Sequence, residues 1–200
     1  MKKPNKIKER LKGEVCTYKD FLTLFPHCEK NVQDDLVNRL QEQPRPSTFC
    51  GKEVPENLNA LSYGTLDDLR TAAGAEDPIS ACCKVLLGIE PHQLLNADVN
   101  EVFGFLSFIK RELEKINKLF TAIHQTYSKE EEAAGIRELD FGSFGILDWY
   151  ARRMGITNQN EVRDVAWVRI YQCMKNDNMQ SEFERRLHKQ YMNNSKVKKR

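Results

Sequence analysis

The position of the prolines constrains this chain more than any other feature of its sequence. All seven prolines lie at or before Pro91, and residues 92–200 contain none. Proline lacks a backbone N–H donor and its ring clashes with the preceding helical turn, so it interrupts helices. We therefore expect short, divided helices up to Pro91 and long, continuous helices after it.

One long helix is predicted over residues 98–125. Asp98 and Glu101 form a capping box at its start. Apolar residues then recur at alternating spacings of three and four, at Val99, Val102, Leu106, Ile109, Leu113, Ile116, Phe120 and Ile123. This heptad stripe predicts a helix that buries one face, and the same seam is suited to pairing with a second copy of the chain. Charged residues beyond Lys110 predict that the second half of the helix is covered on one side only.

Shorter helices are predicted before this long one, near residues 17–25 and 31–42. The segment 43–51 is expected to be a loop without regular structure, because it holds two prolines and a glycine. A further helix is expected to run from Thr65, as its N-cap, to about Ala73. Another is expected over Ile79–Leu87, where the start signals are Asp77 and Pro78 and the stop signal is Gly88.

After the long helix, a capping box formed by Ser128 and Glu131 predicts a short acidic helix that ends at Gly135. Three more helices are expected over residues 143–154, 160–175 and 179–192, and Asn176-Asp177-Asn178 is expected to separate the last two. No segment of five or more residues alternates convincingly between apolar and polar side chains, so any sheet should be small.

These elements predict an all-α fold, an irregular multi-helix bundle with one long central helix (about 98–125) and a helical C-terminal segment. The predicted organisation is a basic flexible N-terminus over 1–14, a helical core domain over 15–127, a C-terminal helical subdomain over 128–192 and a basic tail over 193–200. Basic termini of this kind are usually solvated.

The composition narrows the class of protein. The chain is 40% hydrophobic and 30% charged, which suffices for a core, and no apolar run is long enough to cross a bilayer. The basic N-terminus lacks the apolar segment of a secretory signal, so we expect a cytoplasmic protein. Its cysteines are expected to be buried free thiols in a reducing compartment: Cys16, Cys28, Cys50, Cys82, Cys83 and Cys173. A net charge of +2 gives no general reason to bind nucleic acid.

No pattern in the sequence indicates catalysis, a metal or a cofactor. Cys16, His27, Cys28 and Cys50 lie in one region, but they lack the close C-x2-C pairs of a structural zinc site. The four histidines are isolated in sequence, and no glycine-rich phosphate loop occurs. We therefore expect no catalytic residue, no metal ligand and no cofactor.

A helix-turn-helix motif is one interpretation of residues 147–156, because Ala151 and Gly155 have the spacing that its turn requires. The positions that should seat the recognition helix hold Glu161 and Asp164 instead of apolar residues. The charge over residues 140–170 is balanced, whereas a DNA-binding face should carry a basic surplus. DNA binding is therefore kept only as an alternative.

The same part of the chain is rich in aromatic residues. Aromatic residues at helical spacing are usually part of a core, but they can also form a groove for a partner helix. Glycines beside two of them, in Phe141-Gly142-Ser143-Phe144-Gly145, permit a close backbone approach. The candidate partner-binding residues are Phe141, Phe144, Trp149, Tyr150, Trp167 and Tyr171.

Residues 141–187, with the run Leu147-Asp148-Trp149-Tyr150-Ala151-Arg152-Arg153-Met154-Gly155-Ile156, resemble small helical tail-assembly proteins of tailed phages. Residues 61–89 fit the same pattern. The resemblance implies a tail assembly chaperone in the host cytoplasm, which coats the helical tape-measure protein or another tail protein and needs no cofactor and no catalysis. The long helix over 98–125 departs from this pattern and leaves open a virion structural component, such as a connector or capsid-associated protein. A helix-turn-helix DNA-binding regulator is the second alternative.

Overall fold

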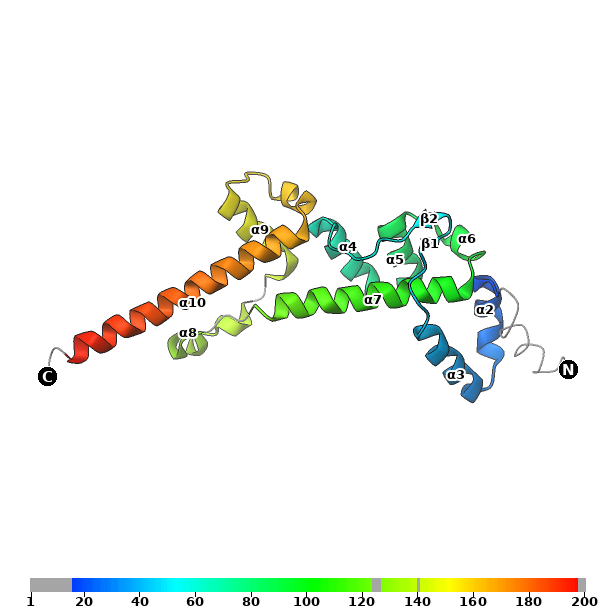
Figure 1. The fold of residues 1–200 in the computed structure, drawn as a ribbon, viewed down its shortest axis with the longest axis horizontal. Coiled ribbons are helices and arrows are strands. Elements are labelled where there is room, and N and C mark those ends of the chain that lie inside the picture. Colours follow the sequence, from blue (N-terminus) through cyan, green and yellow to red (C-terminus); the bar gives the residue numbers. More distant parts are fainter. Residues whose placement is uncertain (1–15, 124–126, 140, 198–200) are drawn as a thin grey trace. The chain divides into compact units, whose positions relative to one another are not determined.

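The computed structural model of the chain describes residues 16–123, 127–139 and 141–197, and most of them lie in helices (Figure 1). The one sheet among these residues consists of two strands, β1 (Thr48–Phe49) and β2 (Lys52–Glu53). The predicted all-α fold, with at most a small sheet, is therefore confirmed. No helix in the described part of the chain is both long and apolar enough to cross a membrane.

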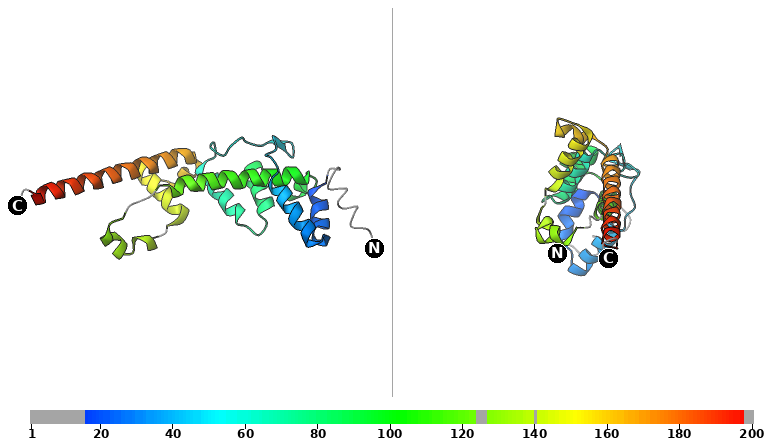
Figure 2. Two further views of the ribbon diagram at one scale, coloured as in Figure 1. Left: turned by 60° about the horizontal axis from the view of Figure 1, so that its bottom comes forward. Right: turned by 90° about the vertical axis from the view of Figure 1, so that its left-hand side faces the viewer.

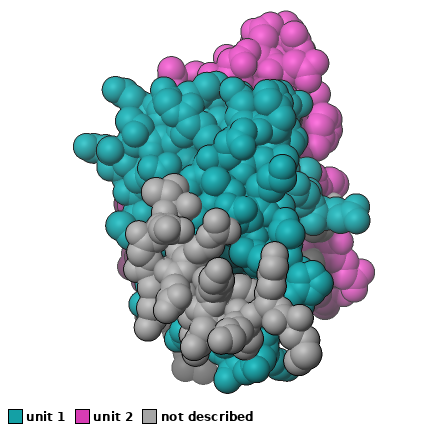
Figure 3. All heavy atoms as spheres, turned by 90° about the vertical axis from the view of Figure 1, so that its right-hand side faces the viewer, with its two compact units in different colours: residues 1–58, 68–115 teal, residues 59–67, 116–200 magenta. Residues whose placement is uncertain are grey.

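The chain divides into two compact units, which Figure 3 shows in different colours. Unit 1 consists of Met1–Leu58 and Asp68–Lys115, and unit 2 consists of Asn59–Asp67 and Ile116–Arg200. The domain boundary predicted between residues 127 and 128 lies inside unit 2, and that division stays a prediction. The predicted N-terminus over 1–14 lies outside the described residues. The predicted tail over 193–200 begins within the last helix, and its end lies outside them.

Unit 1 is built from short helices and one long one, as the prolines predict. Its first helix is capped by Thr17, whose side chain accepts a hydrogen bond from the Asp20 N–H. Asp77 caps a later helix in the same way, through the Ser80 N–H, and Gly88 ends that helix in the left-handed conformation, as predicted. The elements are α2 (Tyr18–Leu24), η1 (Phe25–His27), α3 (Lys30–Gln41), α5 (Pro78–Leu87), α6 (Pro91–Leu94), the hairpin β1–β2, most of α4 (Tyr63–Ala73) and most of α7 (Val99–Thr121).

The core of unit 1 surrounds the first half of α7. Phe105, which is fully buried, stacks on Phe49 of the hairpin with 5.1 Å between the ring centroids. Phe103 meets Phe21 of α2 edge to face at 5.3 Å. The Ser107 hydroxyl donates a hydrogen bond of 2.9 Å to a carbonyl at the end of α3. Three different segments therefore pack on this part of α7, which agrees with the prediction that only the second half of the helix is covered on a single side.

The long helix and its buried stripe are confirmed, with one difference at its end. The helix ends at Thr121, and residues 124–126 of the predicted range lie outside the described residues. Most of the stripe is buried within the chain: Val99, Val102, Ile109, Leu113 and Ile116. Pairing of this seam with a second copy stays a prediction, and the side chains that it would use are covered within the chain.

The segment 43–51 was expected to lack regular structure, and this expectation is wrong at its end. Phe49 pairs with Lys52 across a two-residue turn, and both turn residues, Cys50 (φ 48°) and Gly51 (φ 75°), have positive φ. Two successive positive φ angles define a type I′ turn, which suits the twist of a hairpin. Cysteine is not a usual residue at the first of these positions, so the sequence carries no standard signal for the turn.

In unit 2, the predicted ends of two helices are confirmed. Ser128 and Glu131 form a reciprocal capping box at the start of α8 (Lys129–Ala133). Gly155 ends α9 (Gly142–Met154) in the left-handed conformation. The remaining elements are the first residues of α4, the last turn of α7, η2 (Ile136–Glu138), η3 (Gln159–Asp164) and α10 (Trp167–Val197).

The last helix differs from the prediction. Residues 160–175 and 179–192 were expected to form two helices, but α10 runs without a break from Trp167 to Val197, through Asn176-Asp177-Asn178. Asparagine and aspartate disfavour a helix by only about 0.7 kcal/mol per residue relative to alanine, so three of them do not end one. Residues 159–164 form the separate 3-10 helix η3, which begins after Asn158.

The start of α4 also differs from the prediction. Ser62, and not Thr65, supplies the capping oxygen, which accepts a hydrogen bond of 3.1 Å from the Thr65 N–H. The helix therefore begins at Tyr63, and its N-cap lies three residues before the predicted one. Backbone hydrogen bonds from Tyr63 N–H to the Val165 carbonyl (2.7 Å) and from Trp167 N–H to the Leu61 carbonyl (3.2 Å) join this segment to the start of α10 within unit 2.

Candidate partner-binding surface

The candidate surface lies on helix α9, and the buried face of this helix packs against the rest of unit 2. Leu147, Tyr150 and Ala151 are buried on that face. At the start of the helix, the Ser143 hydroxyl donates a hydrogen bond of 2.5 Å to Asp67, which belongs to the first turns of α4. The other Asp67 oxygen lies 3.7 Å from the Arg163 guanidinium. The polar contact at the start of α9 and the apolar contacts of its buried face therefore fix which face of the helix points outward.

Two phenylalanines at the start of α9 are exposed. Phe141 is 68% exposed and Phe144 is 61% exposed, although large apolar side chains are usually covered. Gly142 adopts a φ of +52°, which L side chains rarely adopt. A Cβ at Gly145 would lie 2.7 Å from the Cβ of Phe141, so only glycine lets the Phe141 side chain lie over the first turn. The glycines predicted to permit close approach therefore do so within the chain, where they position Phe141.

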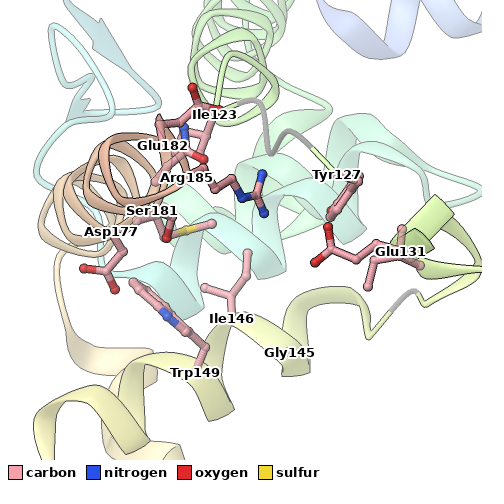
Figure 4. Close-up of a pocket in the computed structure, with 13 residues that line it drawn as sticks. Ile123, Tyr127, Glu131, Gly145, Ile146, Trp149, Asp177, Ser181, Glu182 and Arg185 are labelled. Atoms are coloured by element: carbon pink, nitrogen blue, oxygen red, sulfur yellow. The ribbon is translucent and has the colours of Figure 1, made fainter. Parts of the chain in front are cut away.

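A pocket of about 610 Å³ lies between α8, α9 and α10 in unit 2. Ile146 and Trp149 of α9 form one wall, and residues of α10 form another. Figure 4 shows the Arg185 side chain of α10 pointing into the pocket, with Glu131 of α8 on the far side. A hydrogen bond from the Ser128 N–H lowers the pKa of the Glu131 carboxyl, and Arg185 lowers it further. The pocket thus combines apolar walls with one cation, Arg185, and three acidic side chains, Glu131, Asp177 and Glu182.

The two exposed phenylalanines line a second, shallower depression of about 790 Å³ on the outer side of α9. Trp149 borders both hollows, so the apolar surface is continuous from Phe144 to the pocket wall. Arg152 and Arg153 border the outer depression as well. Such a surface, with aromatic anchors and charged groups at its edge, has the composition of protein-binding surfaces.

The structure separates the six predicted partner-binding residues into two groups. Phe141, Phe144 and Trp149 lie together on the surface described above. Tyr150 and Trp167 are 1% and 2% exposed, so they form part of the core of unit 2. Tyr171 is half-buried and meets Phe120 edge to face, with 5.6 Å between the ring centroids. The partner-binding role of these residues stays a prediction, and the first group is the one with accessible side chains.

The geometry of α9 and α10 bears on the helix-turn-helix interpretation. That motif joins its two helices by a turn of about three to four residues. Here α9 ends at Met154 and α10 begins only at Trp167, with η3 between them. The two arginines of the motif also form ion pairs within the chain: Arg152 lies 2.7 Å from Asp148, and Arg153 lies 2.9 Å from Asp177. Asp177 also raises the pKa of the Arg153 guanidinium.

The cysteines are all free. Cys16, Cys82 and Cys83 are buried, as predicted, whereas Cys28, Cys50 and Cys173 are partly exposed. Burial raises the pKa of the Cys82 thiol to about 11 and that of Cys83 to about 12, so both are poor nucleophiles near neutral pH. Within residues 16–123, 127–139 and 141–197, no group of three or more His, Cys, Asp or Glu side chains is placed to hold a metal ion.

Sequence reasoning missed a second apolar surface, which lies on the C-terminal part of α10. Met179, Phe183 and Tyr191 are each more than half exposed, and Leu187 is half-buried between them. Their regular spacing of four residues is visible in the sequence, within the helix predicted over 179–192. We call these four residues the α10 stripe.

Comparison with known proteins adds no further assignment. No protein family, curated protein or solved structure matches this chain.

Proposed function

We propose that this chain is a non-enzymatic assembly protein that works by binding another protein. The resemblance of residues 61–89 and 141–187 supports a role like that of a tail assembly chaperone. In this role, its partner is the tape-measure protein or another tail protein of a tailed phage, in the host cytoplasm. The observation that carries the proposal is the exposed aromatic pair Phe141 and Phe144, which lies beside Trp149 and the pocket.

Exposed aromatic side chains favour a protein ligand for a physical reason. Covering a phenylalanine side chain stabilises a complex by about 1.5–3 kcal/mol relative to leaving it in water. An amphipathic helix is a suitable ligand, because its apolar face can cover Phe141 and Phe144 while its polar side chains reach charged groups at the edge. In the adjoining pocket, Arg185 supplies a positive charge, and Glu131, Asp177 and Glu182 supply negative charges.

The proposal is tested by co-expression with the long, helix-rich reading frame encoded nearest to this gene. The expected result is a soluble complex that co-purifies, together with aggregation of the long protein when this chain is absent. If none of the neighbouring reading frames yields a complex with this chain, the proposal is contradicted.

A surface variant tests whether the exposed aromatic pair carries the binding. Replacing both residues by serine, Phe141→Ser with Phe144→Ser, is expected to weaken the complex by about tenfold to a hundredfold, in the range of hot-spot residues. Leu22→Ser is the matched control, because Leu22 is an exposed apolar residue (47%) of unit 1. Equal losses in both variants would show that the aromatic pair is not the binding surface.

Mass spectrometry of purified virions separates the chaperone from the virion structural component. A chaperone is expected to be absent from the mature particle, whereas a connector or capsid-associated protein is present in fixed copy number. The paired state of Arg152 and Arg153 and the long connection between α9 and α10 give no support to a DNA-binding regulator.

A further inference from the structure

We propose that the C-terminal part of α10 pairs in an antiparallel manner with the same segment of a second copy of this chain. The starting observation is the α10 stripe, whose side chains at residues 179, 183 and 191 are 60%, 57% and 63% exposed. Residues four apart lie on one face of a helix, so the stripe forms a continuous apolar surface. The last turns of α10 extend past α8 and α9 (Figures 1 and 2).

The stripe is distinct from the pocket described above. The α10 residues that line the pocket include Asp177, Ser181 and Arg185. Each lies two positions from a stripe residue, and two positions correspond to a rotation of about 200° around a helix. One face of α10 therefore borders α8 and α9, and the opposite face carries the stripe. Self-pairing through the stripe leaves the proposed partner-binding surface accessible.

The charges beside the stripe favour a second copy as the occupant. Glu182, which also borders the pocket, and Arg186 lie on one flank of the stripe, and Glu184 and His188 lie on the other. In an antiparallel pair related by a twofold axis, each flank meets the same flank of the other copy. If the twofold axis crosses α10 at the level of residue 185, Glu182 lies close to Arg186 of the second copy, and Glu184 lies close to its His188. Each flank is thus complementary to itself in this orientation.

The apolar residues match in the same register. With the centre near Arg185, Phe183 meets Leu187 of the second copy, and Met179 meets its Tyr191. Rows of residues spaced by four pack into one another at a crossing angle of about −50°, so the contact is closest at Phe183 and Leu187 and loosens towards Met179 and Tyr191. An interface of this size falls in the transient class, below about 1,200 Å² in total. We therefore expect a weak dimer that forms at micromolar concentrations and above.

The experiment is sedimentation velocity of the full chain over a concentration series from micromolar to several hundred micromolar. The wild type is expected to shift from monomer to dimer, and Phe183→Glu is expected to raise the Kd by more than about tenfold, because it places a charge in an apolar contact. Met192→Glu is the matched control: Met192 is also an exposed apolar residue of α10 (50%), but it lies opposite the stripe. This variant should dimerise like the wild type.

A charge reversal tests the orientation. Arg186→Glu is expected to weaken the dimer, because it places two acidic groups together on one flank. Adding Glu182→Arg to the same chain is expected to restore the wild-type Kd, since the pair is then reversed. A wild type that stays monomeric throughout the series would overturn the proposal. It would also be overturned by a dimer that Phe183→Glu leaves unchanged, or by one that Met192→Glu weakens equally.

Discussion

Gly104 lies inside α7, at a position where a helix ordinarily favours alanine over glycine. A Cβ at this position would lie 2.2 Å from the carbonyl oxygen of Pro44, a backbone atom that cannot rotate away. Gly104→Ala is therefore expected to destabilise the protein by about 1–3 kcal/mol, the usual effect of overpacking, in spite of the better helix propensity of alanine. Denaturant unfolding measures this change.

Gly74→Ala is the control for that substitution. Gly74 also belongs to unit 1, but a Cβ there would meet its nearest atom, the Thr71 carbonyl oxygen, at an ordinary 3.7 Å. Its stability is expected to stay within about 0.5 kcal/mol of the wild type, as for most surface substitutions. If Gly104→Ala were as stable as Gly74→Ala, the close approach of Pro44 to α7 would be refuted.

The buried pair Cys82 and Cys83 predicts a loss of stability at alkaline pH. Burial raises the thiol pKa from 9.0 to about 11 for Cys82 and to about 12 for Cys83. Above pH 9 the unfolded chain releases protons that the folded chain still holds, so the free energy of unfolding falls as the pH rises. The contribution of the two thiols is complete below pH 9 and is lost progressively towards pH 12.

The measurement is urea unfolding at a series of pH values from 8 to 10.5, on the wild type and on a Cys82→Ala, Cys83→Ala variant. The variant is expected to be less stable at pH 8, because it leaves cavities in the core, but to lose stability less steeply above pH 9. Equal slopes for the two proteins would contradict the assigned burial of these thiols.

At the residue scale, the sequence predicts those features whose cause is local. Asp77 and Ser128 cap helices as expected, because their hydrogen bonds reach only three residues along the chain. The role of Gly104 and the turn at Cys50 were not predictable, since the atoms that constrain them belong to distant segments or to an unusual turn residue. Exposure of Phe144 and burial of Tyr150 are likewise decided by which face of α9 packs inward.

Helix α7 permits a test at the scale of one element, because its first half is more deeply buried than its second half. Phe105 is fully buried against Phe49, whereas Leu119 is 41% exposed. Phe105→Ala is expected to reduce the free energy of unfolding by about 3–5 kcal/mol, and Leu119→Ala by less than about 1 kcal/mol. The midpoint of urea unfolding gives both values, and similar losses would disprove the asymmetry.

A helix was predicted more accurately where several sequence signals agreed on its bounds. For α7, the capping residue, the heptad stripe and the absence of proline all indicated one long helix, and only its end differed. For α10, the polar run at residues 176–178 indicated a break, although no glycine or proline supports one. Helix propensities differ by less than about 1 kcal/mol per residue, so packing and continuity outweigh three weak formers.

At the scale of the whole molecule, the candidate surface was only partly predictable. The aromatic density of residues 141–171 identified the right region, but it could not distinguish core residues from exposed ones. That distinction depends on the tertiary contacts of α9 and α10, such as the hydrogen bond from Ser143 to Asp67, which lies 76 residues away in the sequence. The exposed part of the candidate surface could therefore be identified only from the three-dimensional structure.

Self-association through α10 also predicts a local change in dynamics. Helices shorter than about 12–15 residues are marginally stable in water unless they pack against another surface. The last turns of α10 extend past the other elements of unit 2, so their backbone amides are expected to exchange with solvent quickly when the protein is dilute. Pairing adds protection by a factor of about one plus the ratio of free protein concentration to Kd.

Hydrogen exchange measured at a few micromolar and at several hundred micromolar tests this prediction. Amides of residues 183–193 are expected to exchange more slowly at the higher concentration, while those of α9 keep the same rate at both. In Phe183→Glu the amides of α10 should exchange quickly at every concentration, because the second copy no longer covers the stripe. Concentration-independent exchange in the wild type would instead mean that this part of α10 gains no stability from a second copy.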